Sequence, residues 1–451
     1  MNAKAGPPAH GLRRVVGVTF GIAAVVGGTI GGGILRTPGT IAGLLHDPSL
    51  ILVVWLACGA LVLISANSMA ELAAAVPRAG GPYEYCTLAF GRFGGFAIGW
   101  SDWLTNVCAL AFLSVAAAEF TETLLGLPAS WTSLLAVAVL AVIALLNWFG
   151  LKLGSRVQEV LSLAKVVGLG AIIVACLVHA VGTGRHELDA APIAGPAAAA
   201  GAVAMLFAVV RSMQLMYETY QGWNSGVYFA EEDLDSARNV PRAMFTGIFL
   251  VIAVYVLVNL AVLAVVPMSQ LATSKLAVAD AAGVVFGPSA QRTVTLLALV
   301  SLLGILNITA MFTPRVLFAL GRDGLSLPSA ARINAHGVPG IATLVSLAIS
   351  AAMAAAGTFE ALFEITGTIG MLVNSAAMFA YFRLRQSHPQ LARPYRAKGH
   401  PWLPAIALAT TLTLLVAIGF ANPLTSAAAF SLLALSYPAY RWIDRRRVRP
   451  D

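Results

Sequence analysis

Long apolar runs separated by short polar connections make up most of the chain. About twelve runs reach roughly 20 residues, the length with which an α-helix crosses a hydrocarbon core about 30 Å thick. The pattern therefore predicts an all-α integral membrane protein with about twelve transmembrane helices. The runs are 15–43, 49–75, 94–120, 131–149, 156–181, 198–229, 242–266, 290–319, 338–357, 360–383, 402–421 and 424–442.

Glycine-rich segments interrupt two of these runs. The first is VVGGTIGGGI at residues 25–34, and the second is TYQGWNSG at residues 219–226. Non-helical backbone survives at membrane depth only where it lines a cavity or is buried in protein. A helix-packing face of small residues would also explain the first segment alone. Two breaks in corresponding parts of the chain instead favour the substrate site of a transporter.

The two breaks also predict how the chain is organised. Each opens the first helix of a five-helix set, and an odd number of helices per set makes the two sets inverted copies of one another. We expect a LeuT-like 5+5 inverted repeat with discontinuous first and sixth helices. The parts are a cytoplasmic tail 1–14, a first repeat 15–181, a second repeat 198–383, two additional helices 402–442 and a basic tail 443–451.

Composition and charge agree with a membrane protein. The chain is 59% hydrophobic and 11% charged, whereas a soluble domain has about 25% charged residues. The net charge of +8 arises mainly from connections on the side of both chain ends, which places the termini in the cytoplasm and the protein in the plasma (inner) membrane. The basic tail is a topology and anionic-lipid signal, not a nucleic-acid site. The four cysteines lie in or beside the spans, so we expect no disulfide-linked partner.

Unwound helices suit a zwitterionic amino acid. The N-terminal end of a half-helix offers free N–H groups, and a C-terminal end offers free carbonyls. We assign the substrate carboxylate to N–H groups near Gly31, Gly32 and Gly33, and the ammonium to carbonyls of Thr29 or Ile30 and of residues 218–221. The predicted substrate-binding residues are Thr29, Ile30, Gly31, Gly32, Gly33, Glu218, Thr219, Tyr220, Gln221, Gly222, Trp223 and Asn224.

Short motifs in a fixed order carry a family resemblance. They are Gly31-Gly32-Gly33-Ile34 with Thr37-Pro38-Gly39, Ala70-Glu71-Leu72, PRAGGPY at 77–83, Gly99-Trp100, Gln158-Glu159 with Lys165, Tyr220-Gln221-Gly222-Trp223-Asn224 with Glu231-Glu232, Arg315-Val316-Leu317 with Gly321-Arg322-Asp323-Gly324, and Arg393-Pro394-Tyr395 with Pro401-Trp402. Together they resemble the amino acid–polyamine–organocation superfamily. The second break and Lys165 are most similar to its L-type amino acid transporter branch.

The resemblance implies roles for several charged residues. Lys165 matches a lysine that replaces a sodium ion between helices 1, 5 and 8, which favours proton coupling or exchange; Thr309 and Thr313 are the candidates facing it from helix 8. Glu218 stands where relatives carry an aromatic gate. It is a candidate counter-charge for a cationic substrate, a proton-coupling group, or an ion-pair partner. Arg36 is a candidate outer gate, closing against Glu218 or Glu364.

The sequence lacks the motifs that other functions would require. The chain has no metal-ligand spacing of histidines, no nucleophile elbow and no P-loop, so we predict neither an enzyme nor a cofactor. Gln221, Asn224 and Asn106 favour a neutral amino acid, with a cationic amino acid or polyamine as the alternative. A non-transporting nutrient sensor is a remote alternative. The acidic run at 231–235 is expected to cap the inner end of helix 6 in solvent.

Overall fold

The structure is a computed structural model that describes residues 11–184, 201–287, 289–356 and 359–447, except for the side chains of 359–365, 425, 446 and 447. Within these ranges the chain is helical and contains no β-strand. A single isolated bridge pairs Val16 with Asp233. The predicted all-α class is confirmed.

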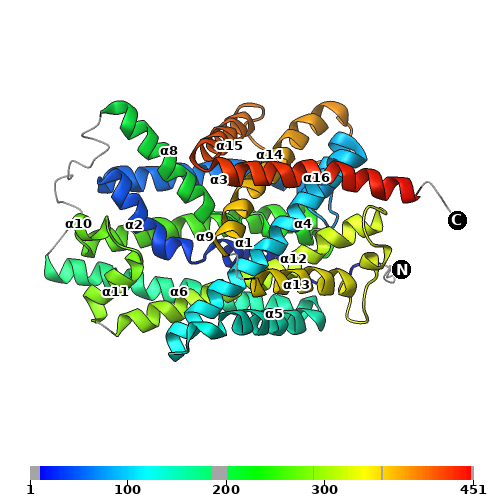
Figure 1. The fold of residues 1–451 in the computed structure, drawn as a ribbon. Helices are drawn as coiled ribbons and strands as arrows, with labels where there is room; N and C mark the ends of the chain where they lie inside the picture. Colours follow the sequence, from blue (N-terminus) through cyan, green and yellow to red (C-terminus); the bar gives the residue numbers. More distant parts are fainter. Residues whose placement is uncertain (1–10, 185–200, 288, 357–358, 448–451) are drawn as a thin grey trace, which may run out of the picture.

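Each predicted apolar run contains a helix (Figure 1). The first run is split into two helices, and the sixth ends in a 3-10 turn. The helices are α1 (Val18–Thr29), α2 (Gly33–Leu45), α3 (Pro48–Ala75), α4 (Pro82–Leu125), η1 (Ala129–Trp131), α5 (Thr132–Trp148), α6 (Leu151–Thr183), α8 (Ala202–Thr219), η3 (Ser225–Phe229), α9 (Ser236–Val265), α10 (Met268–Leu271), α11 (Ala277–Phe286), α12 (Ala290–Arg322), η4 (Pro328–Ala331), α13 (Gly340–Ala355), α14 (Phe359–Ser387), α15 (Trp402–Ala421) and α16 (Pro423–Arg447).

The protein is a multi-pass membrane protein. In the described part of the chain, seven helices are long and apolar enough to cross a bilayer, and the bent pair α1 and α2 makes up to eight. The remaining predicted spans are shorter or more polar: α13 has 16 residues, and α8 carries Arg211 and Glu218 within 18 residues. Twelve spans therefore stay a prediction.

The helices pack into two groups joined by α6 and α14. In the first group, α3 and α1 pack on α9, and α8 packs on α3; in the second, α4 packs on α12 and α5, and α13 packs on both α5 and α4. α6 contacts α1 and α9 as well as α12, and α14 lies along α4 while also touching α3. The start of the described chain and the C-terminal end of α16 lie at the same end of the bundle (Figure 1).

The acidic run after η3 corrects one expectation. Glu232 is only 1% exposed and forms a bidentate pair with Arg315 of α12, which is 2% exposed. The carbonyl of Glu232 accepts from Val15 N and Val16 N, at 2.8 and 3.2 Å. Glu232 is thus packed against Val15 and Val16 instead of lying in solvent, because a buried arginine and two backbone donors compensate its charge and carbonyl. Leu234 and Asp235 of the same run are exposed.

Replacing Arg315 by alanine should destabilise the protein. The change leaves the Glu232 carboxylate buried without its partner, which costs about 3–5 kcal/mol. Chemical unfolding of the detergent-solubilised protein would measure this loss. Arg238→Ala is the control, because Arg238 is 76% exposed and its pair with Asp235 spans 3.9 Å; equal stability of the two variants would contradict the expectation.

Candidate functional site

The first break separates α1 from α2. Ile30 leaves the helix with an extended conformation (φ −72°, ψ 106°), and the two half-helices are bent by 45°. Gly32 caps the N-terminus of α2, and no side chain bonds to the amides of that cap. The backbone N–H groups at the start of α2 are therefore uncapped. The positive end of a half-helix at this point favours an anion.

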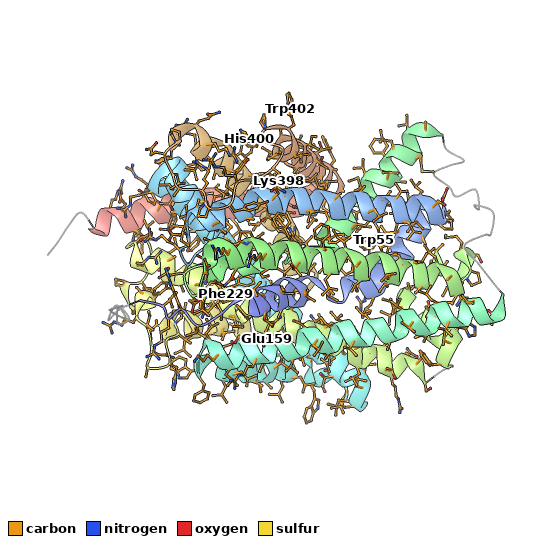
Figure 2. The ribbon with its side chains drawn as sticks, turned by 180° about the vertical axis from the view of Figure 1, so that it is seen from behind. Trp55, Glu159, Phe229, Lys398, His400 and Trp402 are labelled. Carbon is orange, nitrogen blue, oxygen red and sulfur yellow. The ribbon has the colours of Figure 1, made fainter. Side chains whose placement is uncertain are left out.

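The second break follows α8. The helix ends at Thr219, and the chain resumes as the 3-10 turn η3. Gly222 has a φ of +100°, a conformation that side-chain-bearing residues rarely adopt. Phe229 at the end of η3 lies toward the end of the bundle where α16 emerges, and Trp55 lies toward the other end (Figure 2).

The two breaks touch each other through glycine. A Cβ atom on Gly222 would lie 2.3 Å from the carbonyl oxygen of Gly28, and one on Gly28 would lie 3.2 Å from the carbonyl oxygen of Gly222. A side chain at Gly222 would therefore strike backbone. Gly28 and Gly222 therefore bring the backbones of the two broken segments into contact.

Lys165 lies where the sequence predicted it. The side chain is fully buried, and its Nζ donates to the carbonyls of Gly27 and Ile30 at 2.8 Å each and to that of Ser301 at 3.1 Å. All three ammonium protons are used. The lysine joins α6 to the end of α1 and to α12, although its partner on α12 is the Ser301 backbone and neither Thr309 nor Thr313.

Tyr255 is a residue that sequence analysis missed. Its buried hydroxyl lies 2.8 Å from the carbonyl oxygen of Thr29 and 2.9 Å from that of Thr219. These are the last residues of α1 and α8, so one phenol from α9 bridges the C-terminal ends of both broken helices. The ring packs on Trp55 and Tyr220. A single tyrosine in an apolar run gives no signal that distinguishes this role from ordinary packing.

The predicted lining residues divide into accessible and buried ones. Gly33 is exposed, whereas Gly32, Gln221, Gly222 and Asn224 are partly exposed. The buried members are Thr29, Ile30, Gly31, Thr219, Tyr220 and Trp223. Tyr220 packs between Trp55 and Tyr255, which favours a packing role for its ring.

Some buried polar atoms beside the breaks have no protein partner. Among the described residues, Thr29 Oγ1, Gln221 Nε2 and Trp223 Nε1 make no hydrogen bond. Asn224 Nδ2 instead donates to Asn374 Oδ1 of α14 at 3.0 Å. Buried polar atoms are normally satisfied, so these three are candidates for contact with a bound solute.

The charged gate candidates Glu218 and Arg36 lie beside different helices. Glu218 is partly buried, and its Oε1 lies 3.6 Å from the position a Cβ on Gly367 of α14 would occupy. The guanidinium of exposed Arg36 lies over the Phe120 ring of α4, 5.9 Å from its centroid. Arg36 thus faces α4 in this structure. The side chain of Glu364 lies outside the described residues.

After the second break, polar contacts join η3 and the residues that follow it to α4 and α12. The Tyr228 hydroxyl of η3 donates to buried Asp102 of α4 (3.0 Å to Oδ2), and the Tyr228 ring stacks on Phe312 of α12. Nearer the end of α12, Arg322 pairs with Glu84 and with Glu231, and Tyr83 donates to Asp323 at 2.6 Å. We call the Arg322, Glu84 and Glu231 group the inner closure.

These features define a multi-pass membrane protein with two broken helices that meet at a candidate site. Residues 16–437 match the family model described as Amino acid permease, so the chain belongs to the amino acid permease family. The resemblance predicted from the motifs is thereby confirmed. So is the prediction of an amino acid transporter as opposed to an enzyme.

Curated relatives cover nearly the whole chain. The serine/threonine exchanger SteT of Bacillus subtilis is 25% identical over 447 residues, which span 97% of this chain and 99% of that protein. The b(0,+)-type amino acid transporter 1 of Mus musculus is 28% identical over 435 residues, 91% of this chain and 84% of that protein. Large neutral amino acids transporter small subunit 2 of Homo sapiens is 29% identical over 444 residues, 95% and 80% respectively.

Adding a methyl group at Gly32 should weaken substrate binding without harming the fold. A Cβ there meets no atom within 4 Å, so the substrate-free protein can accommodate alanine, but the methyl group would stand where a substrate approaches the α2 amides. We expect a KM increase of at least tenfold, about 1.4 kcal/mol, at unchanged thermal stability. Gly182→Ala, also in open space, is the control. An unchanged KM for Gly32→Ala would remove this amide end from the site.

Proposed function

We propose that the protein is a secondary active transporter that carries amino acids by alternating access, with the substrate held between the two breaks. The observation that carries the proposal is the junction of the two breaks. An uncapped helix N-terminus lies beside two helix C-termini that are fixed by Lys165 and Tyr255. The substrate carboxylate takes the amides near Gly32.

The substrate ammonium has fewer places to bind. The carbonyls of Thr29 and Thr219 already face the Tyr255 hydroxyl, and that of Ile30 accepts from Lys165. A carbonyl oxygen has two lone pairs, so each can accept a second bond. We assign the ammonium to these remaining lone pairs and to the carbonyls of residues 218–221.

Recurring contacts support an inverted repeat. Counterparts in the two five-helix sets pair with one another: α3 with α9, α4 with α12, and α5 with α13. In addition, α6 packs on α12 and α9, and its counterpart α14 packs on α4 and α3. A pseudo-twofold axis explains this pattern, because it relates each helix to its counterpart. The contacts of α6 with α12 and α9 then recur as contacts of α14 with α4 and α3. We therefore infer twelve spans arranged as 5+5+2, with both termini in the cytoplasm of a plasma-membrane protein.

Lys165 supports coupling without sodium. Its side-chain nitrogen occupies the carbonyl cluster of Gly27, Ile30 and Ser301 that would otherwise suit a bound cation. A covalently attached cation cannot be exchanged for sodium from solution. Transport then runs on a proton gradient or on exchange against an internal amino acid.

The accessible groups favour a neutral amino acid. Gln221 and Asn224 are uncharged and partly exposed, and Asn224 is held by Asn374. The partly exposed Glu218 carboxylate beside Gly367 supports a cationic amino acid or polyamine as the second candidate.

Uptake by the purified protein in liposomes tests the proposal. We expect labelled amino acid to enter vesicles preloaded with unlabelled amino acid or energised by an imposed proton gradient, and sodium to have no effect. Competition by the twenty amino acids and putrescine identifies the substrate, and Glu218→Gln separates the two classes. Binding with no uptake under either condition would indicate a sensor and overturn the proposal.

Removing the Lys165 ammonium should abolish transport. In Lys165→Ala, the three buried carbonyls lose their donor and α1 loses its link to α6 and α12, so we expect uptake to fall at least a hundredfold. Lys152→Ala, an exposed lysine on the same helix, is the control. Full uptake by a monodisperse Lys165→Ala protein would exclude the lysine from the mechanism.

A further inference from the structure

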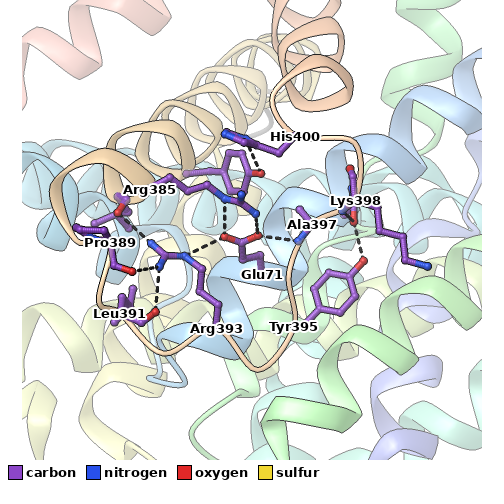
Figure 3. Close-up of polar contacts among 12 residues, drawn as sticks. Glu71, Arg385, Pro389, Leu391, Arg393, Tyr395, Ala397, Lys398 and His400 are labelled. Carbon is purple, nitrogen blue, oxygen red and sulfur yellow. Dashed lines mark hydrogen bonds and ion pairs between the residues drawn. The ribbon is translucent and has the colours of Figure 1, made fainter.

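The loop between α14 and α15 is fastened to the end of α3 by one buried carboxylate (Figure 3). Glu71 of α3 is 3% exposed and accepts a bidentate pair from Arg385, the last turn of α14. It also forms an ion pair with Arg393 (Nε to Oε1, 3.1 Å) and accepts from the backbone N–H of Ala397 at 2.7 Å. We call Glu71, Arg385 and Arg393 the α3–α14 clamp.

Bonds on either side of the clamp hold the same loop. Asn67, one turn before Glu71, donates to the carbonyl of Lys398 at 2.8 Å and accepts from the Tyr395 hydroxyl at 2.6 Å. Arg393 donates to the carbonyls of Leu384 and His388 at 3.0 Å each. The loop thus closes the C-terminal end of α14 and is bound to α3 as well.

The rest of α14 belongs to other neighbours. The helix lies along α4, and its middle reaches the second break, where Asn374 accepts from Asn224 and Gly367 lies beside Glu218. From Gly370 to Arg385 is 15 residues, roughly 22 Å of helix. One helix is therefore attached to α4, to the substrate region and to α3.

These attachments conflict if α14 is a rigid rod. In the proposed transport cycle, alternating access moves the α1, α3, α8 and α9 group against the α4, α5, α12 and α13 group, and α14 contacts both. Either the clamp opens in each cycle or α14 bends between its two attachments. The segment 366–370 reads Thr-Gly-Thr-Ile-Gly, and a Cβ on Gly370 meets nothing within 4 Å. Glycine weakens a helix at such a point.

We propose that the α3–α14 clamp stays closed throughout the transport cycle and makes the inner end of α14 move with α3, while α14 bends at residues 366–370 beside the substrate. Glu71 is a positioning residue in this scheme: it transmits events at the second break to α3 through α14. The inference rests on the proposed transport function.

The clamp holds its carboxylate with more partners than the inner closure does. In each group a nearly buried glutamate pairs with a partly exposed arginine: Glu84 and Arg322 are 4% and 24% exposed, and Glu71 and Arg385 are 3% and 22% exposed. Glu71 also has a second arginine, Arg393, which is 9% exposed, and the backbone N–H of Ala397, whereas Glu231 of the closure is 25% exposed. Opening the clamp would therefore leave more buried charge without a partner than opening the closure.

Cross-linking tests whether the clamp and the inner closure open during transport. Asn67→Cys with Lys398→Cys ties the loop to α3 and leaves the clamp itself intact. Ala79→Cys with Glu231→Cys ties the inner closure, where Ala79 N donates to Glu231 Oε2 at 2.9 Å. A short bifunctional methanethiosulfonate would be applied to each variant in liposomes. Because Asn67 and Ala79 are themselves buried, the cross-linked fraction of each variant is measured by intact mass, and uptake is scored only for preparations in which at least nine-tenths of the protein is cross-linked. The wild-type protein, whose four cysteines are buried, is the reagent control.

We expect the cross-linked Asn67–Lys398 variant to keep at least half of its uptake and the cross-linked Ala79–Glu231 variant to lose at least nine-tenths of it, reversibly with reductant. Reversible loss in the Asn67–Lys398 variant would show that the clamp opens and would overturn this inference alone. Uptake unaffected by the Ala79–Glu231 cross-link would instead contradict alternating access at the inner closure.

Kinetics of clamp variants test the positioning role. Glu71→Gln keeps the shape but removes the charge that pairs two arginines; we expect kcat to fall at least tenfold and KM to change less than threefold. Glu71→Asp should restore part of kcat. Proportionate loss of folded protein with normal kcat per folded molecule would assign Glu71 to stability only. If Glu71→Gln does not fold, the cross-linking result decides.

Discussion

The structure depends on how the carbonyl oxygens freed by two helix breaks are satisfied. A bilayer interior offers them no water, so the protein must supply donors. Lys165 supplies three protons to carbonyls of Gly27, Ile30 and Ser301, and Tyr255 lies between Thr29 and Thr219. The carbonyl ends are thus largely satisfied by the protein, while the amide end of α2 is not. In the proposed site, this asymmetry would make the substrate's carboxylate the principal anchor and its ammonium the secondary one.

Backbone contact at Gly28 and Gly222 couples the breaks mechanically. Because no side chain separates the two segments, a shift of one displaces the other. Asn224 extends this coupling to α14 through Asn374. In the proposed site, a substrate on the α2 amides would therefore act on three helices without touching each of them. Tyr228, which follows the second break, links η3 in turn to Asp102 and to the Phe312 ring.

Local signals explain what the sequence could predict. Apolar runs of membrane-spanning length and a triple glycine are short-range patterns, so the helices, the first break and Lys165 lie as expected. Tyr255 escaped because its partners, Thr29 and Thr219, are distant in the chain and a tyrosine in an apolar run has no distinctive spacing. Glu232 was misplaced for the same reason: an acidic run suggests solvent unless the burying arginine, Arg315, is known to lie opposite it.

Access to water determines which ion pairs can break and re-form during a conformational change. Arg315 and Glu232 are 2% and 1% exposed, and they join the segment after η3 to α12, two elements that part if the proposed alternating access opens the inner side. Water entering from that side would then hydrate both ions as their contact is lost. In the proposed cycle, α3, the loop and the end of α14 move together, so the ions of the clamp are not parted. Burial alone therefore does not make an ion pair permanent; what matters is whether the motion that parts the ions also brings them water.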